Sequence, residues 1–321
     1  MATKETNSQL RVAFFVATFP SVSETFVINQ VADLLDRGVH VEVFAFGRSN
    51  DSHISTRYLA YKMSDHTHYL RRPVLDWRFC RRGIPGLLRL MMHPISGIRV
   101  LEYCCRKRSP RPIVWCLPFI GRQFDLVHCH FGDLGNFFLA IKDVLRLQMP
   151  IVTTFYGYDA SKVFHQSPAT IYDRLMRECS LFFVMSNDMR RRLLTRGFPE
   201  EKVKVLPVSI DVDSYPFSER ICRREVPIEM ISVARLVEKK GVDDLLTALS
   251  IVRQRTERNF HCSIIGSGQL EQQLRELRSS LALEDLVDFK GCMKVEDIVQ
   301  LLPKMHMMIQ PSKTASDGDM E

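Results

Sequence analysis

The chain has 321 residues, of which 45% are hydrophobic and 25% are charged. This length suits two domains, because a single hydrophobic core stops growing near ~250–300 residues. The composition excludes a disordered chain and a collagen-like chain. The sequence shows no apolar run of the ~18–20 residues that a membrane-spanning helix needs, and its polar amino terminus does not resemble a signal peptide. We therefore expect a cytoplasmic, globular protein.

The cysteines also favour a cytoplasmic protein. There are nine, an odd number, scattered along the chain without any C-x-x-C pair. Such a distribution argues against a disulfide framework and against a zinc ribbon. We expect reduced thiols and no structural metal.

The positive charge is concentrated in one segment. The net charge is +7, but residues 71–122 hold 12 Arg or Lys against Asp76 and Glu102, a local charge of 12 − 2 = +10. Leu, Ile, Trp and Phe are interspersed with these cations, as on surfaces that bind anionic lipid headgroups. A solvated helical insertion with an apolar underside explains the segment equally well. Nucleic acid is a weaker candidate, because no recognisable nucleic-acid-binding motif accompanies the basic residues.

Short β-branched runs alternate with amphipathic stretches, a pattern typical of parallel sheets flanked by helices. The predicted fold class is therefore α/β. In the first part of the chain the predicted strands are 12–17, 39–46, 124–130, 150–155, 180–186 and 202–208.

Two loops of this first part carry helix-start signals. Ser21 precedes Glu24 by three residues, the spacing of a capping box, at the start of a helix that ends at Gly38. Ser186 is the predicted N-cap of a second helix, which ends at Gly197.

A polar stretch at 211–227 predicts a linker between two doubly wound domains. Residues 1–210 form the first domain, with the basic insertion at about 48–122, and residues 228–321 form the second. Ligands of such sheets bind at the carboxyl ends of the strands, so we expect a cleft between the two domains. The second domain has predicted strands at 228–236, 260–266, 286–291 and 305–312 and helices at 242–255, 269–281 and 296–302.

The second domain also holds the residues best suited to phosphate. Arg235 ends a predicted strand, and Lys240 comes just before a helix. A guanidinium and an ammonium together suit a diphosphate, although a solvated turn would also carry them. Gly266-Ser267-Gly268 is either a tight strand-to-helix turn or a place where backbone amides meet phosphate. The first domain lacks the G-x-G-x-x-G of dinucleotide enzymes after its first strand.

VARLVEKKGVDDLLTAL at 233–249 resembles the donor-phosphate motif of the family 4 retaining glycosyltransferases, which have the GT-B fold of two Rossmann-like domains. Further stretches resemble the family in matching order, most closely its bacterial colanic acid and exopolysaccharide enzymes. These stretches are 13–45, 124–135, 152–161, 203–217 and 264–277.

The resemblance implies transfer of a hexose, with retention at the anomeric carbon, from a nucleotide sugar to an acceptor. The acceptor would be a saccharide or a polyprenyl-diphosphate-linked saccharide, and no metal or other cofactor would be required. We then expect a cytoplasmic enzyme, attached to the inner face of the plasma membrane if residues 71–122 bind lipid.

By the same resemblance, Arg235 and Lys240 neutralise the leaving diphosphate, and Gly266 and Gly268 let backbone amides approach the donor. His130 matches the family's active-site histidine near the donor hexose. Two other readings of His130 stay open. It could be packed in the core, or it could bind zinc together with His128, which would face the same side of the strand.

On the acceptor side, Ser21, Ser23 and Glu24 occupy the turn where relatives often carry glycines. Hydroxyl groups there would suit sugar hydroxyls. Tyr156 stands where many relatives have a histidine, and Asp159 matches the family pattern.

Glu321 aligns with the first of the family's two signature glutamates, which contacts the donor hexose. The second glutamate and the family's last strands and helix have no counterpart in this sequence. We therefore expect an incomplete second domain of low stability and low activity. The alternatives are an inactive remnant that binds a nucleotide sugar or a partner, and a membrane-surface scaffold that uses residues 71–122.

Overall fold

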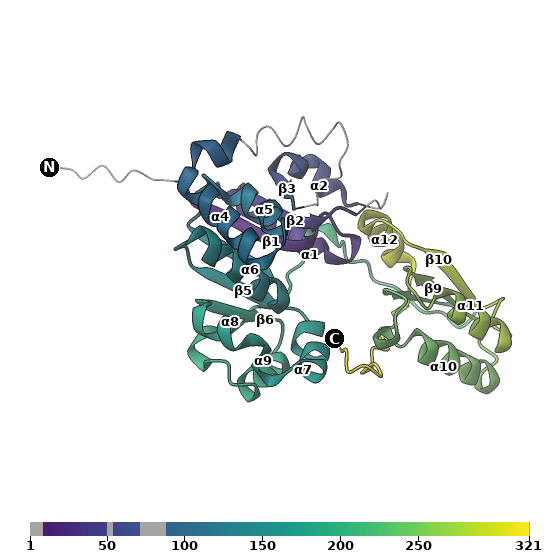
Figure 1. Cartoon of the computed structure of the whole chain (residues 1–321). Coiled ribbons are helices and arrows are strands. Elements are labelled where there is room, and N and C mark those ends of the chain that lie inside the picture. The colour runs from purple at the N-terminus through teal and green to yellow at the C-terminus, as the bar shows by residue number, and fades with distance from the viewer. Residues whose placement is uncertain (1–8, 50–53, 71–87, 321) are drawn as a thin grey trace. The chain divides into compact units, whose positions relative to one another are not determined.

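The computed structural model describes residues 9–49, 54–70 and 88–320 (Figure 1). They divide into two compact units. Unit 1 comprises Met1–Asn50, Arg57–Ala160 and Ser167–Val208, and unit 2 comprises Asp51–Thr56, Ser161–Gln166 and Ser209–Glu321.

Unit 1 is built on a parallel sheet of seven strands in the order β3-β2-β1-β4-β5-β6-β7. The chain moves outward from β1 to β3, returns to the other side of β1 with β4, and then moves outward again. The order therefore reverses between β1 and β4, the place where such sheets form a ligand crevice at their carboxyl edge. The strands are β1 (Arg11–Thr18), β2 (His40–Gly47), β3 (Thr67–Tyr69), β4 (Leu126–His130), β5 (Ile151–Phe155), β6 (Leu181–Val184) and β7 (Val203–Val205).

All six strands predicted for this part are confirmed. β1, β2 and β5 are apolar and buried along most of their length, as expected for parallel strands covered on both faces. The three-residue β3 was not predicted, because it is too short to show a periodic pattern. It pairs with the edge of β2 and lies within the segment predicted as a helical insertion.

Unit 2 has a smaller parallel sheet with the order β10-β9-β8-β11. The four predicted strands are confirmed, and so is the helix predicted at 242–255, which is α10. A cluster of buried side chains that includes Leu236, Leu246, Ile264 and Leu283 joins the sheet to its helices. The strands are β8 (Ile228–Val233), β9 (Phe260–Ile265), β10 (Val287–Gly291) and β11 (Met307–Met308).

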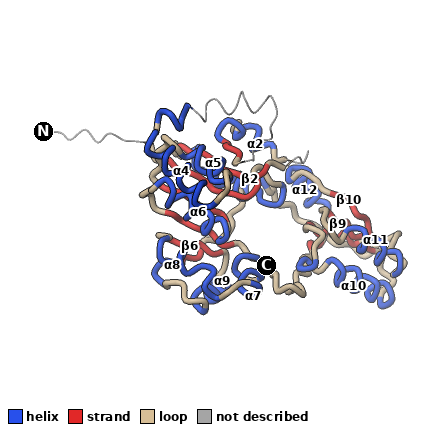
Figure 2. Tube along the Cα trace, viewed as in Figure 1, coloured by secondary structure: helices blue, strands red, loops and turns tan. Residues whose placement is uncertain are grey.

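Helices alternate with the strands in both units (Figure 2). In unit 1, α6 packs against β1, β4 and β5, and α4 packs on α5 and α6. None of the helices in the described ranges is long and apolar enough to cross a membrane. Their bounds are α1 (Thr25–Asp36), α2 (Thr56–Ala60), α4 (Pro94–Lys107), α5 (Arg111–Cys116), α6 (Gly132–Leu145), α7 (Lys162–Gln166), α8 (Asp173–Glu178), α9 (Asn187–Thr195), α10 (Val242–Arg255), α11 (Glu271–Ser280) and α12 (Val295–Leu301).

Of the two predicted helix-start signals, one is confirmed and one is wrong. The Ser186 hydroxyl accepts a hydrogen bond from the Met189 amide and caps α9. The Ser21–Glu24 capping box does not form. A 3₁₀ turn at Val22–Glu24 delays the start of α1 to Thr25, and the Ser21 hydroxyl lies 3.3 Å from the Ser23 hydroxyl instead.

A nearly buried carboxylate in β2 lies among arginine and histidine side chains. Glu42 is 8% exposed. Its oxygens lie 2.6 Å from His68 Nε2 and 2.9 Å from Arg122 Nε. Burial raises the pKa of Glu42, but the hydrogen bond from His68 and the charge of Arg122 outweigh it and lower the pKa to about 2. The folded pKa is thus below the unfolded one, so this carboxylate contributes stability that is lost as the pH falls from about 4.5 to about 2.

We expect Glu42→Gln to destabilise unit 1 by roughly 3 kcal/mol, because it leaves the largely buried Arg122 guanidinium without its counter-charge. Urea unfolding followed by tryptophan fluorescence measures this, since both tryptophans of the sequence fall within unit 1. Glu200→Gln, at an exposed pair with Arg190, is the matched control and should change stability by less than about 0.5 kcal/mol. Equal effects of the two variants would contradict the assigned role of Glu42.

Candidate functional site

Each unit has a candidate site at the carboxyl edge of its own sheet. In unit 1 the relevant loops follow β1, β4 and β5, which are neighbours in the sheet. They carry Ser21, Ser23 and Glu24 after β1, His130 at the end of β4, and Tyr156 with Asp159 after β5. The structure therefore brings the predicted acceptor-side residues and His130 to the same edge of one sheet. Ser23 is exposed, while Ser21 and Glu24 are half-buried.

His130 lies inside unit 1, with an exposed fraction of 0%. Its ring stacks on Phe14 at 5.0 Å and on His128 at 4.4 Å, and its Nδ1 lies 2.8 Å from the Tyr156 hydroxyl. Its Nε2 is buried and has no hydrogen-bond partner among the residues that the structure describes. An unpaired buried nitrogen costs roughly 1–3 kcal/mol, which makes it notable at a candidate site.

Burial also determines the charge of the two histidines. It lowers the pKa of His128 to about 4. Burial lowers the pKa of His130 well below its ordinary value, and the neighbouring His128 adds to this effect. Both rings are therefore neutral near pH 7, and His130 can give or accept a hydrogen bond but cannot supply a positive charge. His128 Nε2 is engaged 2.7 Å from the Thr154 hydroxyl. No cluster of three His, Cys, Asp or Glu side chains suited to a metal ion occurs in the described ranges.

Asp159 holds the loop after β5 against the start of α6. It is completely buried and accepts hydrogen bonds from the amides of Gly132, Tyr156 and Gly157 at 2.9, 3.1 and 3.0 Å. Gly132 is the first residue of α6, so a carboxylate at this place also meets the positive end of the helix dipole. Asp159 therefore fixes the backbone that carries Tyr156 and does not present its carboxylate to solvent.

The pKa of Asp159 is raised to about 6, because burial outweighs the three hydrogen bonds from the backbone. A carboxyl whose folded pKa is raised binds its proton more tightly in the folded state, so its contribution to stability rises as the pH falls from about 6 towards 3.8.

In unit 2 the loops after β8, β9 and β11 pack on one another. The Leu236 amide donates to the Ser267 carbonyl at 2.9 Å, and the Leu270 amide donates to the Leu236 carbonyl at 3.0 Å. A Cβ on Gly266 would lie 1.8 Å from the Ala234 carbonyl oxygen, so only glycine fits at this contact. A Cβ on Gly268 would lie 2.4 Å from the Leu236 oxygen. The glycine turn is therefore adjacent to Arg235.

Arg235 is exposed, and its side chain has no hydrogen bond or ion pair with any residue that the structure describes. Lys240 ends the 3₁₀ turn Glu238–Lys240 and is half-buried. Both predicted phosphate ligands thus follow β8 at the carboxyl edge, and Arg235 lies next to the turn at Gly266. Glu321, the remaining predicted donor contact, lies outside the described residues.

Two residues beside this pair were missed from the sequence. Lys239 is 7% exposed, and its ammonium lies 3.1 Å from the Asp319 carboxylate. The Glu238 carboxylate accepts hydrogen bonds from the amide and the hydroxyl of Ser316 at 2.7 and 2.8 Å. These contacts anchor the loop after β11 to the loop after β8. The sequence contains no signal for them, because the partners are far apart along the chain.

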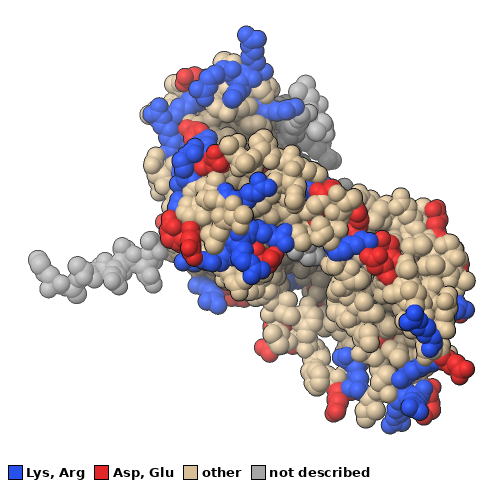
Figure 3. All heavy atoms as spheres, turned by 90° about the horizontal axis from the view of Figure 1, so that it is seen from below, with Lys and Arg blue, Asp and Glu red and all other residues tan. Residues whose placement is uncertain are grey.

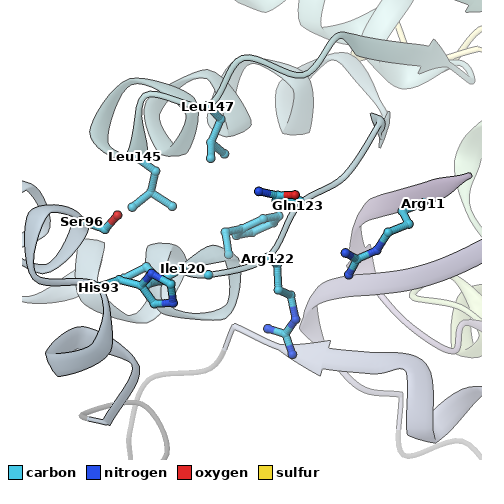
Figure 4. Close-up of a pocket in the computed structure, with 10 residues that line it drawn as sticks. Arg11, His93, Ser96, Ile120, Arg122, Gln123, Leu145 and Leu147 are labelled. Atoms are coloured by element: carbon cyan, nitrogen blue, oxygen red, sulfur yellow. The ribbon is translucent and has the colours of Figure 1, made fainter. Parts of the chain in front are cut away.

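A pocket of about 380 Å³ lies at the opposite, amino edge of the unit 1 sheet (Figure 4). Arg11 at the start of β1 and Arg122 before β4 contribute to its lining. Both arginines lie within 4 Å of Glu42, at 3.7 and 2.9 Å. The pocket therefore belongs to the surroundings of Glu42 and not to the candidate site.

The buried carboxyl of Asp159 generates a pH prediction. We expect unit 1 to gain roughly 2 kcal/mol of stability from this group when the pH falls from about 6.5 to about 4.5, and Asp159→Asn to abolish that gain. Urea unfolding at several pH values, followed by tryptophan fluorescence, measures the difference. Asp143→Asn, at an exposed pair with Arg174, is the control and should leave the pH dependence as in the wild type. If Asp159→Asn leaves the change of the unfolding free energy with pH as in the wild type, the raised pKa of Asp159 is contradicted.

Comparison with known proteins gives two family matches. The model described as Glycosyltransferase Family 4 matches residues 23–214, and the model described as Glycosyl transferases group 1 matches residues 218–318. Among similar proteins is WcaL of Salmonella typhimurium, whose name assigns it to colanic acid biosynthesis as a glycosyltransferase. It is 31% identical over 97% of this chain and 78% of its own length. The amylovoran biosynthesis glycosyltransferase AmsK of Erwinia amylovora is 29% identical over the same shares.

Solved structures show the same fold at low identity. Anabaena HepE is similar with a TM-score of 0.62 and 16% identity, over 95% of this chain and 74% of HepE. Sucrose-phosphate synthase from Thermosynechococcus elongatus is similar with a TM-score of 0.61 and 14% identity, over 96% of this chain and 76% of the synthase. The predicted GT-B fold with two Rossmann-like sheets is thereby confirmed. From its family match and its relatives, the chain belongs to Glycosyltransferase Family 4.

Proposed function

We propose that this glycosyltransferase moves a hexose from a nucleoside-diphosphate sugar to a saccharide or a lipid-linked saccharide, with retention at the anomeric carbon, in exopolysaccharide synthesis. The observation that carries the proposal is the unpaired, exposed guanidinium of Arg235 beside the tight glycine turn at Gly266. An unpaired cation next to a glycine turn suits the charge that grows on a leaving diphosphate.

Within this proposal, Arg235 grips the diphosphate oxygens and Lys240 adds a second positive charge. Lys240 is half-buried, whereas the adjacent Lys239 is buried and paired with Asp319, so Lys240 is the lysine nearer to solvent. The Gly266 amide donates to the Gly291 carbonyl at 2.8 Å, so the amides of Ser267 and Gly268 are the ones that would contact phosphate, and Glu321 would contact the donor hexose. We propose that these residues act without a metal or other cofactor.

In unit 1, neutral His130 would give a hydrogen bond to the sugar through Nε2. Because its ring is completely buried, this contact requires the covering side chains to move aside. Tyr156 is half-buried and its hydroxyl is hydrogen-bonded to His130 Nδ1. Tyr156 is therefore nearer to solvent than His130. Ser21, Ser23 and Glu24 would contact the acceptor, and Asp159 would act by holding the backbone of Tyr156.

The relatives support the assignment to exopolysaccharide synthesis. The names of WcaL and AmsK place them in the biosynthesis of colanic acid and amylovoran. HepE was solved with UDP and glucose and with UDP-glucose, which supports a uridine diphosphate sugar as the first donor to test. We further propose a cytoplasmic location with peripheral attachment to the inner face of the plasma membrane.

We expect Arg235→Ala to lower the transfer rate by ~10²–10³, because it removes one preorganised contact to the developing charge. We expect the same variant to weaken binding of uridine diphosphate by about tenfold or more, since a charge-assisted hydrogen bond is worth ~1.5–3 kcal/mol. Isothermal titration with uridine and guanosine diphosphates measures binding, and release of the free diphosphate measures transfer.

The matched control is Arg253→Ala. Arg253 lies in the last turn of α10, at the opposite end of this helix from Lys240, and pairs with Asp285 at 3.0 Å. It should leave diphosphate binding unchanged. If Arg235→Ala binds both diphosphates as the wild type does, the proposed donor site is wrong.

A further inference from the structure

Four aromatic residues gather at the carboxyl edge of the unit 1 sheet. Phe26 lies in the first turn of α1, Phe131 follows β4, and Tyr156 and Tyr158 follow β5. The ring centre of Tyr156 lies 4.5 Å from that of Phe26 and 4.9 Å from that of Phe131. The ring centre of Phe131 lies 5.2 Å from that of Tyr158. We call these four residues the aromatic platform, and parallel strand pairing brings them together from three segments of the chain.

The aromatic platform is partly open to solvent. All four of its residues are half-buried, whereas Phe155 and Tyr172 in the adjacent core are 0% and 1% exposed. On the face of the molecule drawn in Figure 3, acidic and basic side chains are interspersed, as expected of a solvated surface. Partly exposed aromatic rings beside a few polar groups are instead typical of the lining of small-molecule sites.

The backbone of Phe131 has a conformation that glycine adopts more easily. Its φ is +78° and its ψ is 144°. In this region a residue with a Cβ is strained, and bulky residues are rare there. Two hydrogen bonds hold the conformation: the Phe131 amide donates to the Thr154 carbonyl at 2.8 Å, and the Phe131 carbonyl accepts from the Gly135 amide at 3.1 Å. The backbone therefore favours glycine at position 131, and the phenylalanine ring needs a reason beyond the folding of this turn.

Polar groups accompany the rings. The Tyr158 hydroxyl donates to the exposed Asp133 carboxylate at 2.8 Å, and the Tyr156 hydroxyl lies 2.8 Å from His130 Nδ1. The exposed Ser23 adds a hydroxyl group at the same edge of the sheet. A pyranose ring combines an apolar face of C–H groups with a rim of hydroxyl groups. The rings and the hydrogen-bonding groups together therefore match a sugar.

We propose that the aromatic platform stacks on a sugar ring of the acceptor, with Phe131, which contacts both tyrosine rings, as its main contact. This rests on the proposed glycosyl transfer and adds which groups recognise the acceptor. The aromatic rings cover the apolar face of the sugar, and Asp133 accepts hydrogen bonds from its hydroxyl groups. A polyprenyl chain would also cover the rings, but it has no hydroxyl group to donate to Asp133, so a sugar ring is the better occupant.

Saturation-transfer NMR with methyl β-D-glucopyranoside and methyl β-D-galactopyranoside, without any nucleotide sugar, measures this contact on the whole chain. With the wild type, we expect strong saturation of the ring protons on one face of each glycoside. Phe131→Ala should weaken glycoside binding by about tenfold, because it removes the stacked ring. Phe131→Tyr keeps an aromatic ring and should bind both glycosides within about twofold of the wild type.

Phe131→Gly separates the role of the ring in binding from its role in folding. This variant also lacks the ring, so it should weaken glycoside binding as much as Phe131→Ala does. It relieves the backbone strain, however, so its midpoint of thermal unfolding should be about 4 °C higher than that of Phe131→Ala. The matched control is Phe137→Ala, which removes a half-buried ring from α6, 4.6 Å from the ring of Trp115. It should leave glycoside binding within about twofold of the wild type.

Release of free diphosphate from a nucleotide sugar, with each glycoside as the acceptor, distinguishes this proposal from the proposed function. Glycoside binding that depends on Phe131, without any release, would support the aromatic platform and contradict glycosyl transfer. Release with the same KM for the glycoside in the wild type, Phe131→Ala and Phe131→Gly would overturn the aromatic platform and leave glycosyl transfer standing. The platform is also wrong if the wild type binds neither glycoside, or if Phe131 affects only the binding of farnesyl phosphate.

Discussion

Parallel strand pairing is the constraint on which both units depend. Because every strand of a sheet points the same way, all loops that leave the strands at their carboxyl ends meet at one edge. The loops after β1, β4 and β5 are brought together in unit 1, and those after β8, β9 and β11 in unit 2. Side chains far apart in the sequence become neighbours there without any direct signal between them.

The carboxyl edges of the two sheets use polar side chains differently. In unit 1, His130 and Asp159 are completely buried, and burial keeps the imidazole neutral and raises the carboxyl pKa. They fix the geometry of the loops from within. In unit 2, contacts such as Lys239 with Asp319 hold the loops in place, and Arg235 remains available to a ligand.

The sequence alone determined the secondary structure well, because strands and helices are encoded by local periodicity. The strand from Arg11, the helix from Val242 to Arg255 and the cap at Ser186 all follow from neighbouring residues. It also indicated the tight turn at Gly266 and Gly268. The tertiary structure decided the rest. It showed that Ser21 does not cap α1, because a 3₁₀ turn intervenes, and that the short strand β3 completes the sheet through pairing with β2. It buried Lys239 against Asp319 and it buried His130, because burial and ion pairing depend on residues that are distant along the chain and adjacent only after folding.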